Sequence, residues 1–395
     1  MLLRDVVVDP DGDSPVEIRG AFDVDRTHDG MVLRRLPAWT RPQVPDVFMN
    51  TMVTMTAGVR LAFTTDSPTV ELTVHPRTIH TLPRPAVPPI VQMVVDGALQ
   101  PDTPLVGGSW VHIDRTKGPA GIEFEEGGAV TVCWDGLGDA AKAIEIWLPT
   151  DTSIELRTLR VADGATVSRT PITRPRWTHY GSSISHCVDV DRPFDAWPVM
   201  VANEVGLELT DYGLAGQCQL DPFMGRVIRD TPADVISVKI GINLVNAASM
   251  TERTFIPAVH GLLDHIRDGH PQTPLLVVSP IFCPLVEDRV GPTVPNDEGS
   301  FDVIDIPAAA RPFGLTLQGI RRIIAGIVDQ RRVAGDGNLH HLDGLALFGA
   351  DDEALLYDRL HPSPEGYALL GRRFAAAAFG PGGPLVVQPA NSARS

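Results

Sequence analysis

The chain has 395 residues, of which 43% are hydrophobic and 21% are charged, a balance typical of a globular protein in water. Because a domain usually holds ~100–200 residues, this length indicates two domains. Asp and Glu number 49 against 33 Lys and Arg, and the formal net charge is −16. An acidic surface repels phosphate groups, so we expect neither nucleic acid nor an anionic membrane as a partner. The pairs Arg321-Arg322 and Arg331-Arg332 are interpreted as solvated faces of one helix.

The beginning of the chain lacks the apolar stretch of a secretory signal, because Val6-Val7-Val8 runs directly into Asp9-Pro10. No segment approaches the ~20 apolar residues that span a bilayer. We therefore expect a cytoplasmic protein, unless a leader has been removed. The four cysteines follow no Cys-x-x-Cys spacing, which predicts neither structural disulfides nor a zinc site.

Residues 1–165 show the patterns of short β-strands. Apolar and polar residues alternate in Arg60–Thr64 and again in Val70–Val74. Asp96-Gly97 and Asp135-Gly136 are hairpin signals at the ends of further apolar runs. No helical period of any length occurs in this half. The pattern predicts an antiparallel β-sandwich.

From about Arg174 onward, buried strands alternate with amphipathic helices. Helical spacing of apolar residues occurs in Phe255–Ile266 and in Ile320–Val328. This alternation predicts an α/β layer fold with a parallel sheet. The apolar runs interpreted as buried strands are Val235–Ile240, Leu275–Val278 and Leu345–Phe348.

The boundaries follow from composition. Val167–Arg176 holds two prolines and no apolar period, which indicates a linker between a first domain of residues 1–165 and a second of residues 175–380. Residues 381–395, in the Pro/Gly-rich end of the chain, are expected to form a loosely ordered tail.

The clearest chemical signal lies near the end of the chain, where Asp358 stands three residues before His361. A helix is predicted directly afterwards, with Ser363 as N-cap and Pro364 at the first helical position. Asp358 is close enough to accept the Nδ1–H of His361, which would fix the tautomer and stabilise the imidazolium. Taken alone, such a fragment is more often a surface carboxylate beside a histidine without a catalytic role.

A nucleophile for this base is available at the start of the second domain. Gly181-Ser182-Ser183 follows a short apolar strand and permits a tight turn. Ligands bind at the carboxyl edge of open α/β sheets, which is where these hydroxyls stand. A serine hydroxyl needs a neighbouring base to attack a carbonyl at neutral pH. The competing interpretation is a serine that only caps a helix.

Two further segments supply hydrogen-bond donors at strand ends. Gly216 could present an unhindered backbone N–H, and the Asn243 amide could reach the same edge. Donors aimed at an oxyanion typically contribute ~10²–10³ in rate. Separately, Gly216 is more often a turn glycine and Asn243 a loop cap. All four segments in the right order favour a catalytic function.

With these motifs in order, the second half resembles the SGNH (GDSL-type) serine hydrolases, named for Ser, Gly, Asn and His in four sequence blocks. Ser183 matches the serine of block I, Gly216 the glycine of block II and Asn243 the asparagine of block III. Asp358 and His361 match the Asp-x-x-His of block V. The resemblance covers roughly residues 175–380.

The resemblance implies a flavodoxin-like, three-layer α/β/α domain, a triad of Ser183, Asp358 and His361, and an oxyanion hole of Gly216 and Asn243. It implies no cofactor. Two departures weaken analogy in substrate: the usual Gly-Asp-Ser is Gly181-Ser182-Ser183, and the usual Gly-x-Asn-Asp ends in Leu244. No Gly-x-Ser-x-Gly elbow occurs, which disfavours an α/β-hydrolase.

The first half resembles the jelly-roll-like β-sandwich, similar to a carbohydrate-binding module, that some family members carry before the catalytic domain. The two-domain layout is also similar to that of salicylyl acyltransferases of tetracycline-type antibiotic biosynthesis. Resemblance of this kind says little about a ligand for the sandwich.

Other residues could suggest different chemistry. His75, His80 and the pair His340-His341 match no metal-ligand spacing, so no metal site is expected. His186 is expected to line the pocket rather than to act as the base. Cys187 and Cys218 are interpreted as packing residues, because no histidine motif points to either.

The sequence therefore predicts a serine esterase that forms an acyl-serine intermediate on a small-molecule ester or thioester. A dedicated acyltransferase with an alcohol acceptor uses the same residues and stays open, favoured by a cytoplasmic supply of acyl thioesters and by the extra domain. A catalytically inactive binding protein is the alternative of another class.

Overall fold

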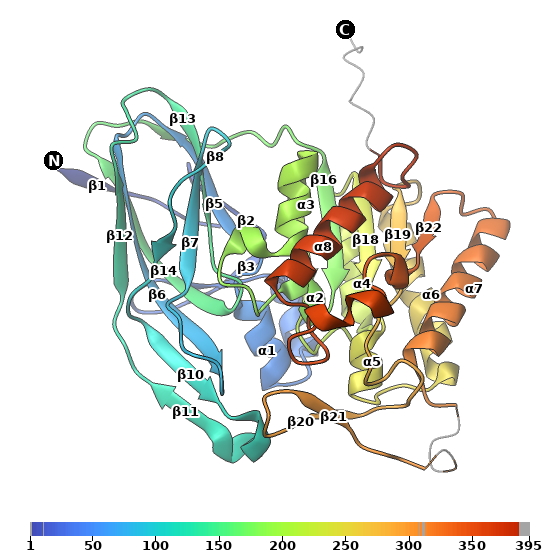
Figure 1. Ribbon diagram of the computed structural model, residues 1–395. Helices are drawn as coiled ribbons and strands as arrows, with labels where there is room; N and C mark the ends of the chain where they lie inside the picture. Colours follow the sequence, from blue (N-terminus) through green and yellow to red (C-terminus); the bar gives the residue numbers. More distant parts are fainter. Residues whose placement is uncertain (1, 11, 308, 310–312, 387–395) are drawn as a thin grey trace, which may run out of the picture. The chain divides into compact units, whose positions relative to one another are not determined.

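The computed structural model describes residues 2–10, 12–307, 309 and 313–386, and the chain divides into two compact units (Figure 1). Within the described residues, the first unit extends to Thr173 and also contains His186–Ala196. The second unit comprises Arg174–Ser185 and the residues from Trp197 onward. The tail expected at residues 381–395 is described only as far as Val386, and the rest lies outside the described residues.

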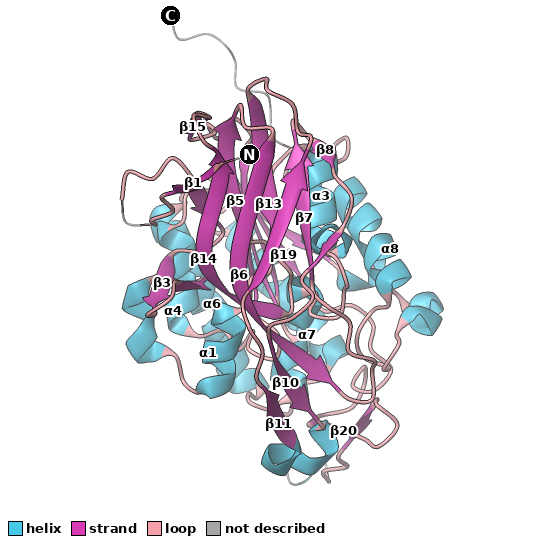
Figure 2. Ribbon diagram, turned by 90° about the vertical axis from the view of Figure 1, so that its left-hand side faces the viewer, coloured by secondary structure: helices cyan, strands magenta, loops and turns pink. Residues whose placement is uncertain are grey.

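The first unit is a β-sandwich of two sheets, as predicted; Figure 2 shows its strands from one side. Side chains from both sheets, among them Phe63, Leu72 and Ile144, form one buried core. Burial alternates along β12, as expected for a strand with one face on that core. One sheet contains β1 (Leu3–Val6), β3 (Asp23–Arg26), β4 (Met31–Arg34), β6 (Thr69–Thr81), β10 (Ser109–Ile113), β11 (Ile122–Glu125), β12 (Val130–Asp135) and β14 (Thr152–Ala162).

The other sheet contains β2 (Glu17–Arg19), β5 (Arg60–Thr65), β7 (Ile90–Val95), β8 (Ala98–Leu99), β9 (Thr103–Pro104), β13 (Lys142–Trp147) and β15 (Val167–Ser168). The pairing is antiparallel except between β6 and β10, which run parallel. The predicted turns at Asp96-Gly97 and Asp135-Gly136 end β7 and β12. Strand β15 lies inside the segment that was expected to be a linker, since Val167 and Ser168 pair with β5.

The prediction that this half lacks helices was wrong. Helix α1 (Val47–Thr54) begins after Asp46, whose side chain accepts a hydrogen bond from the Met49 N–H at 2.7 Å. Its buried residues, Met49, Met52 and Val53, make up only two turns of helical spacing, too short a signal beside the strand patterns. The short helices η1 (Ala38–Gln43) and η2 (Arg115–Gly121) belong to the same unit.

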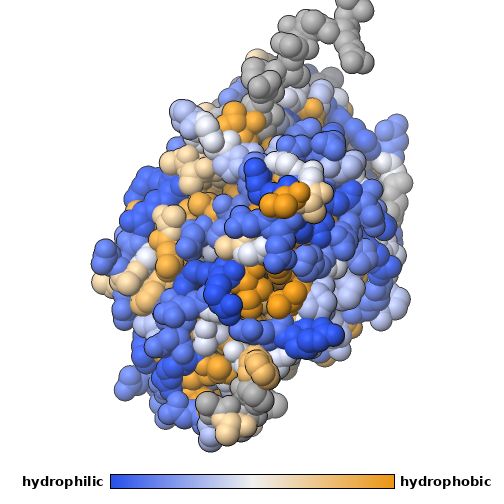
Figure 3. All heavy atoms as spheres, turned by 90° about the vertical axis from the view of Figure 1, so that its right-hand side faces the viewer, coloured by the Kyte–Doolittle hydropathy of each residue, from blue (hydrophilic) through white to orange (hydrophobic). Residues whose placement is uncertain are grey.

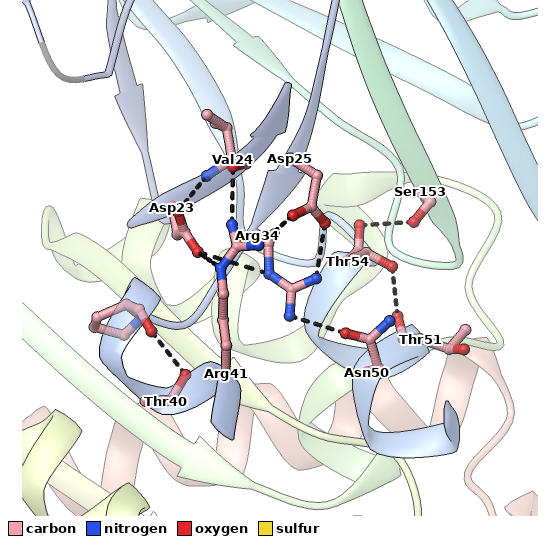
Figure 4. A network of polar contacts seen from close by, with 11 residues as sticks. Asp23, Val24, Asp25, Arg34, Thr40, Arg41, Asn50, Thr51, Thr54 and Ser153 are labelled. Atoms are coloured by element: carbon pink, nitrogen blue, oxygen red, sulfur yellow. Dashed lines mark hydrogen bonds and ion pairs between the residues drawn. The ribbon is translucent and has the colours of Figure 1, made fainter. Parts of the chain in front are cut away.

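Ion pairs hold the segment around α1 to the β3–β4 hairpin (Figure 4). Arg34 contacts Asp25 at 2.9 Å and the Asn50 side chain at 2.9 Å. Arg41, from η1, contacts Asp23 and Asp25, each at 2.5 Å. Because Arg34 is buried, its partners on the neighbouring strand and helix offset the cost of removing its charge from water.

The second unit is an α/β domain around a parallel sheet, and the predicted fold class is confirmed. Its strand order, β17-β16-β18-β19-β22, is the flavodoxin-like order in which the first strand lies between the second and third. The strands are β16 (Arg176–Gly181), β17 (Glu208–Gly213), β18 (Val235–Lys239), β19 (Leu275–Val278) and β22 (Leu339–Leu342).

Two groups of helices cover this sheet: α3 packs on α8, while α6 packs on both α4 and α7 (Figure 1). The helices are α2 (Ser183–His186), α3 (Trp197–Val205), α4 (Pro222–Asp230), α5 (Ile242–Asn246), α6 (Glu252–Gly269), α7 (Leu317–Val333) and α8 (Pro364–Phe374). Shorter elements of this unit are η5 (Gly344–Ala346), η6 (Ala350–Leu355), η7 (Ala375–Phe379) and the hairpin of β20 (Thr293–Pro295) and β21 (Phe301–Val303). The short helix η3 (Pro193–Asp195) belongs to the first unit.

The expected strand at Leu345–Phe348 was wrong. The last strand of the sheet is β22, which carries His340 and His341 and therefore lacks a continuous apolar run. The apolar residues Leu347 and Phe348 are buried, but they lie directly after the 3₁₀-helix η5 and not in a strand. An edge strand needs only part of its surface to be apolar, which explains why the pattern misled.

The face that carries α6 and α7 is mostly hydrophilic, with hydrophobic residues in small separate patches (Figure 3). Arg322 and Arg332 are exposed, as expected. Arg321 is buried, contrary to expectation, because its guanidinium binds Glu287 at 2.6 and 2.7 Å and the Pro280 carbonyl at 2.9 Å. Among the described residues, we find no helix with both the length and the apolar character that a membrane crossing requires.

Candidate active site

A hydrogen-bonded chain joins Ser183, His361 and Asp358. The His361 Nδ1–H donates to Asp358 Oδ2 at 2.7 Å, which leaves Nε2 as an acceptor. Nε2 lies 2.9 Å from Ser183 Oγ and accepts its hydroxyl hydrogen. A base placed within hydrogen-bond reach of a hydroxyl, and oriented by a carboxylate, is the arrangement that activates a serine.

The local structure explains how these side chains meet. Ser183 is the first residue of α2 and follows β16. His361 precedes α8, whose N-cap is Ser363 and whose first residue is Pro364, as predicted from the sequence. Both Ser183 and His361 are 7% exposed. The contact between them is therefore largely shielded from water, which strengthens electrostatic interactions.

Asp358 is held as a carboxylate. Its side chain is 2% exposed. Burial favours the neutral acid, but the charge of His361, its ring N–H and the backbone N–H groups of His361 and Leu360 outweigh burial and lower the Asp358 pKa. The two backbone bonds to Oδ1 are 2.7 and 3.0 Å long. The carboxylate can thus stabilise an imidazolium at His361.

A buried polar network lies beneath the serine, and sequence reasoning missed it. Ser237 Oγ accepts a bond from Trp177 at 2.8 Å and is hydrogen-bonded to His179 Nδ1 at 2.7 Å. His179 Nε2 in turn contacts Ser185 Oγ at 2.8 Å. Burial, together with the charge of Lys239, lowers the His179 pKa to about 3. The ring is therefore neutral and can donate at one nitrogen while accepting at the other.

The network fixes the turn that precedes Ser183. A Cβ on Gly181 would lie 2.1 Å from Ser185 Oγ, so only glycine fits beside that hydroxyl. Part of the signal was present in the sequence, because Trp177 and His179 share one face of a strand. Only the structure gives the register in which His179 pairs with Ser237. A buried histidine in such a pattern requires polar partners on the neighbouring strand.

Asn243 and Gly216 follow the strands on either side of β16. Asn243 is the second residue of α5, after β18, and its Oδ1 accepts the Cys218 N–H at 3.1 Å. The Cys218 N–H can bond only to the oxygen end of this amide, so the bond fixes the orientation of the side chain and of its donor group, Nδ2. Gly216, after β17, has a φ of 71°, which favours glycine.

Gln219 joins these two segments and was not singled out from the sequence. Its Nε2 donates to the carbonyls of Gly216 and Asn243, each at 3.2 Å, and its Oε1 accepts from Ser249 at 2.7 Å. A side-chain amide in a loop carries no pattern of its own, so only the folded chain shows this role. Gln219 fixes the relative position of the two proposed oxyanion donors.

The remaining candidates have other contacts or an unfavourable pKa. His186 is buried and donates from Nε2 to the Thr150 carbonyl at 2.9 Å, within the first unit. Burial raises the Cys218 pKa to about 12, which disfavours a thiolate nucleophile. Among the described residues, no group of three or more His, Cys, Asp or Glu side chains could hold a metal ion.

The two departures from the family pattern are both buried. Ser182 accepts the Ile184 N–H at 3.3 Å, and Leu244 is fully buried in α5.

Comparison with known proteins identifies a related family. The model of the GDSL-like lipase/acylhydrolase family matches residues 179–369, which contain all five proposed site residues. Residues 179–369 belong to this family. The resemblance inferred from the sequence is thereby confirmed. Among curated proteins, no sequence matches this chain.

Solved structures of GDSL-type and related enzymes share both units. The salicylyl-acyltransferase SsfX3 from a tetracycline biosynthetic pathway has a TM-score of 0.75 at 24% identity, covering 94% of this chain and 95% of that one. A protein from Bacteroides ovatus that is described as a GDSL-like lipase has a TM-score of 0.62 at 17% identity, covering 92% of this chain and 95% of that one. A family two carbohydrate esterase from Clostridium thermocellum has a TM-score of 0.58 at 12% identity, covering 92% and 98%. The TM-scores show a shared fold, and at these identities the similarity shows the fold alone.

Proposed function

We propose that this protein is a serine esterase that cleaves small-molecule carboxylic esters through an acyl-serine intermediate. The observation that carries the proposal is the hydrogen-bonded chain from Ser183 Oγ through the His361 ring to Asp358. The family of residues 179–369, whose members are hydrolases and acyltransferases, supports the same chemistry.

In the proposed mechanism, His361 Nε2 takes the Ser183 proton while Ser183 Oγ bonds to the carbonyl carbon of the ester. The imidazolium is stabilised by Asp358 and then gives its proton to the leaving alcohol oxygen as the C–O bond breaks. A water molecule repeats the sequence on the acyl-serine, and this step releases the acid and restores Ser183.

The oxyanion of each tetrahedral intermediate requires donors that are already in place. We assign this role to the Asn243 amide and to the backbone N–H groups of Gly216 and Ser183. Adjacent strands support this assignment, because Ser183, Gly216 and Asn243 all follow the carboxyl ends of β16, β17 and β18, which are neighbours in the sheet. Donors held by the surrounding fold need no reorganisation during the reaction.

The change Ser183→Ala removes the nucleophile and should lower turnover of activated aryl esters by at least about 10³-fold. Intact-protein mass spectrometry with a serine-directed phosphonate should show an adduct on the unaltered chain and none on this variant. Ser182→Ala is the matched control, because its hydroxyl contacts only the adjacent backbone among the bonds described for it, and the variant should still be labelled. Turnover close to that of the unaltered chain in Ser183→Ala would refute the assignment.

Acyl transfer to an alcohol is the second candidate, favoured by the similarity to a salicylyl-acyltransferase over 94% of the chain. The same acyl-serine would then react with an acceptor hydroxyl in place of water. The partition of product between free acid and new ester, measured with increasing alcohol, separates the two functions. A panel of esters and acyl thioesters, with and without acceptors, would define the donor.

An inactive binding protein is the alternative of a different class. Such a protein would retain the fold without an activated serine. Failure of the phosphonate to label Ser183 in a folded sample would favour this alternative over both enzymes.

A further inference from the structure

Two aromatic side chains lie beside the His361 ring. The Phe301 ring, from β21, is centred 6.0 Å from it, and the Tyr357 ring is centred 6.1 Å away and lies within 19° of parallel to it. Tyr357 is 41% exposed and Phe301 is half-buried. Aromatic surface that is accessible directly beside a proposed catalytic base can contact a bound substrate.

The hairpin that carries Phe301 is anchored to the loop of the triad. The Ser300 hydroxyl donates to the Asp358 carbonyl at 2.8 Å. Arg359, within the Asp358–His361 loop, contacts the Phe301 carbonyl at 3.5 Å and Asp302 at 3.7 Å. Several bonds between the hairpin and this loop hold Phe301 at a defined distance from His361.

The other end of the hairpin region is anchored to the helix of the oxyanion residue. Gly291, just before β20, approaches α5 so closely that a Cβ would lie 1.9 Å from the Val245 carbonyl. Val245 belongs to the same short helix as Asn243. The segment from Gly291 to Phe301 therefore runs from the oxyanion side of the site to the histidine side.

Tyr357 is fixed by the same loop. Its backbone N–H donates to the His361 carbonyl at 3.1 Å, so its position is coupled to the histidine backbone. The backbones that carry both aromatic rings are thus tied to the triad loop, as a specificity element requires.

The chemistry of the reaction decides which part of an ester these rings would contact. His361 must give its proton to the leaving alcohol oxygen, so the alcohol portion lies next to the imidazole. The carbonyl oxygen points instead toward the donors of Gly216 and Asn243. Side chains that flank His361 therefore contact the alcohol portion of the ester.

Resting on the proposed function, we propose that Phe301 and Tyr357 form the alcohol-side subsite and select esters whose alcohol portion is a flat, apolar ring. A ring of this kind stacks on aromatic side chains and covers their apolar surface. In acyl transfer, the acceptor alcohol would occupy the same subsite in the second step, because it loses its proton to His361.

The test compares benzyl and methyl esters of one acyl group, since the two alcohols have similar acidity and differ mainly in the ring. The unaltered enzyme should have a kcat/KM about 10-fold higher for the benzyl ester, as expected for one additional buried apolar group. Phe301→Ala and Tyr357→Ala should each reduce this preference severalfold, and Phe301→Leu should have an intermediate effect because it keeps apolar bulk without a flat ring. Phe313→Ala, which removes an exposed phenyl group 74% accessible to solvent, is the matched control and should keep the full preference.

Labelling of Ser183 by a small alkyl phosphonate, measured on every variant, separates this proposal from the proposed function. If Ser183 is labelled and both esters are cleaved with equal kcat/KM, or if the variants lose both activities equally, the subsite is refuted while the esterase stands. A response of the variants to changes in the acyl group and not in the alcohol would also overturn it. If Ser183 is not labelled in the unaltered chain, the proposed function itself fails.

Discussion

Asp358 shows how a single buried charge can serve the proposed reaction. Its pKa is lowered by the His361 charge and by bonds from the loop that it closes, despite burial that acts in the opposite direction. The carboxylate is therefore charged at neutral pH. It is also fixed in the one orientation that presents Oδ2 to the imidazole.

Asp358→Asn keeps the size of the side chain and removes its charge. The amide can donate to Nδ1 and so favours the tautomer in which Nε2 carries the hydrogen, which cannot accept the Ser183 proton. We expect kcat for aryl esters to fall by about 10²–10⁴-fold. Steady-state kinetics will measure this, with Asp351→Asn on the exposed start of η6 as a control of equal charge change. A loss of less than about threefold would contradict the orienting role.

His179 provides a prediction for stability against pH. Its folded pKa is about 3, below the ordinary value of 6.5. Between these pH values the unfolded chain binds a proton that the folded chain does not, so this group favours folding above pH 6.5 and loses that contribution as the pH falls toward 3. The slope for one such group is about 1.4 kcal/mol per pH unit.

His179→Gln removes this titration and retains a polar side chain. The free energy of unfolding should therefore fall less steeply below pH 6.5 in the variant than in the unaltered chain, by up to about 1.4 kcal/mol per pH unit. Taking the difference between the two chains removes the contributions of other buried groups. Among these are His186, whose pKa burial lowers, and Asp151, whose pKa burial raises to about 7. Urea unfolding at several pH values gives the slopes, and a difference that does not change with pH would contradict a neutral His179.

At the scale of elements, the turn from β16 into α2 determines where the proposed nucleophile stands. Gly181→Ala would place a Cβ 2.1 Å from the Oγ and 2.7 Å from the Cβ of Ser185, so α2 has to shift. We expect a loss of stability of about 1–3 kcal/mol and slower phosphonate labelling of Ser183. Thermal unfolding and the labelling rate test both effects.

The control for that change is Gly261→Ala, in α6, where a Cβ would meet open space. Alanine in a helix interior is favoured over glycine by roughly 0.5–1 kcal/mol, so this variant should be slightly more stable. Equal behaviour of the two variants would show that the turn at Gly181 tolerates a side chain.

At the scale of the whole molecule, the chain crosses between the two units more than once. It leaves the second unit after Ser185, contributes His186–Ala196 to the first and returns at Trp197. Within the first unit, Thr150 exchanges hydrogen bonds of 2.9 Å with His186 and Cys187, and the Phe194 N–H donates to Gln92 at 2.9 Å. The segment that follows the proposed nucleophile is therefore part of the sandwich unit.

A chain that begins at Arg174 lacks the partners of His186–Ala196. Because a buried hydrogen bond is worth about 0.5–1.5 kcal/mol and an unpaired buried group costs about 1–3 kcal/mol, we expect a loss of more than about 2 kcal/mol in stability. Labelling of Ser183 should slow as well, and addition of residues 1–173 as a separate chain should restore part of it. A shortened chain as stable and as quickly labelled as the full one would contradict this coupling.

Much of the fold and of the site could be predicted because the deciding signals are local. An Asp and a His three residues apart before a well-capped helix, and a Gly-Ser-Ser turn after a buried strand, identify side chains whose positions follow from short-range geometry. Parallel strands bring their carboxyl ends to one edge, and this general rule placed Ser183, Gly216 and Asn243 near one another before any coordinates.

The sequence by itself therefore determined the family, the two fold types and the residues that meet in the triad. Only the tertiary structure decided which distant residues support them: Phe301 beside His361, Gln219 between Gly216 and Asn243, and the return of His186–Ala196 to the sandwich. It also overturned the strand expected at Leu345–Phe348. The physical reason is that periodicity reports which face of an element is buried, whereas contacts between loops depend on packing partners far away in the chain and leave no repeating pattern.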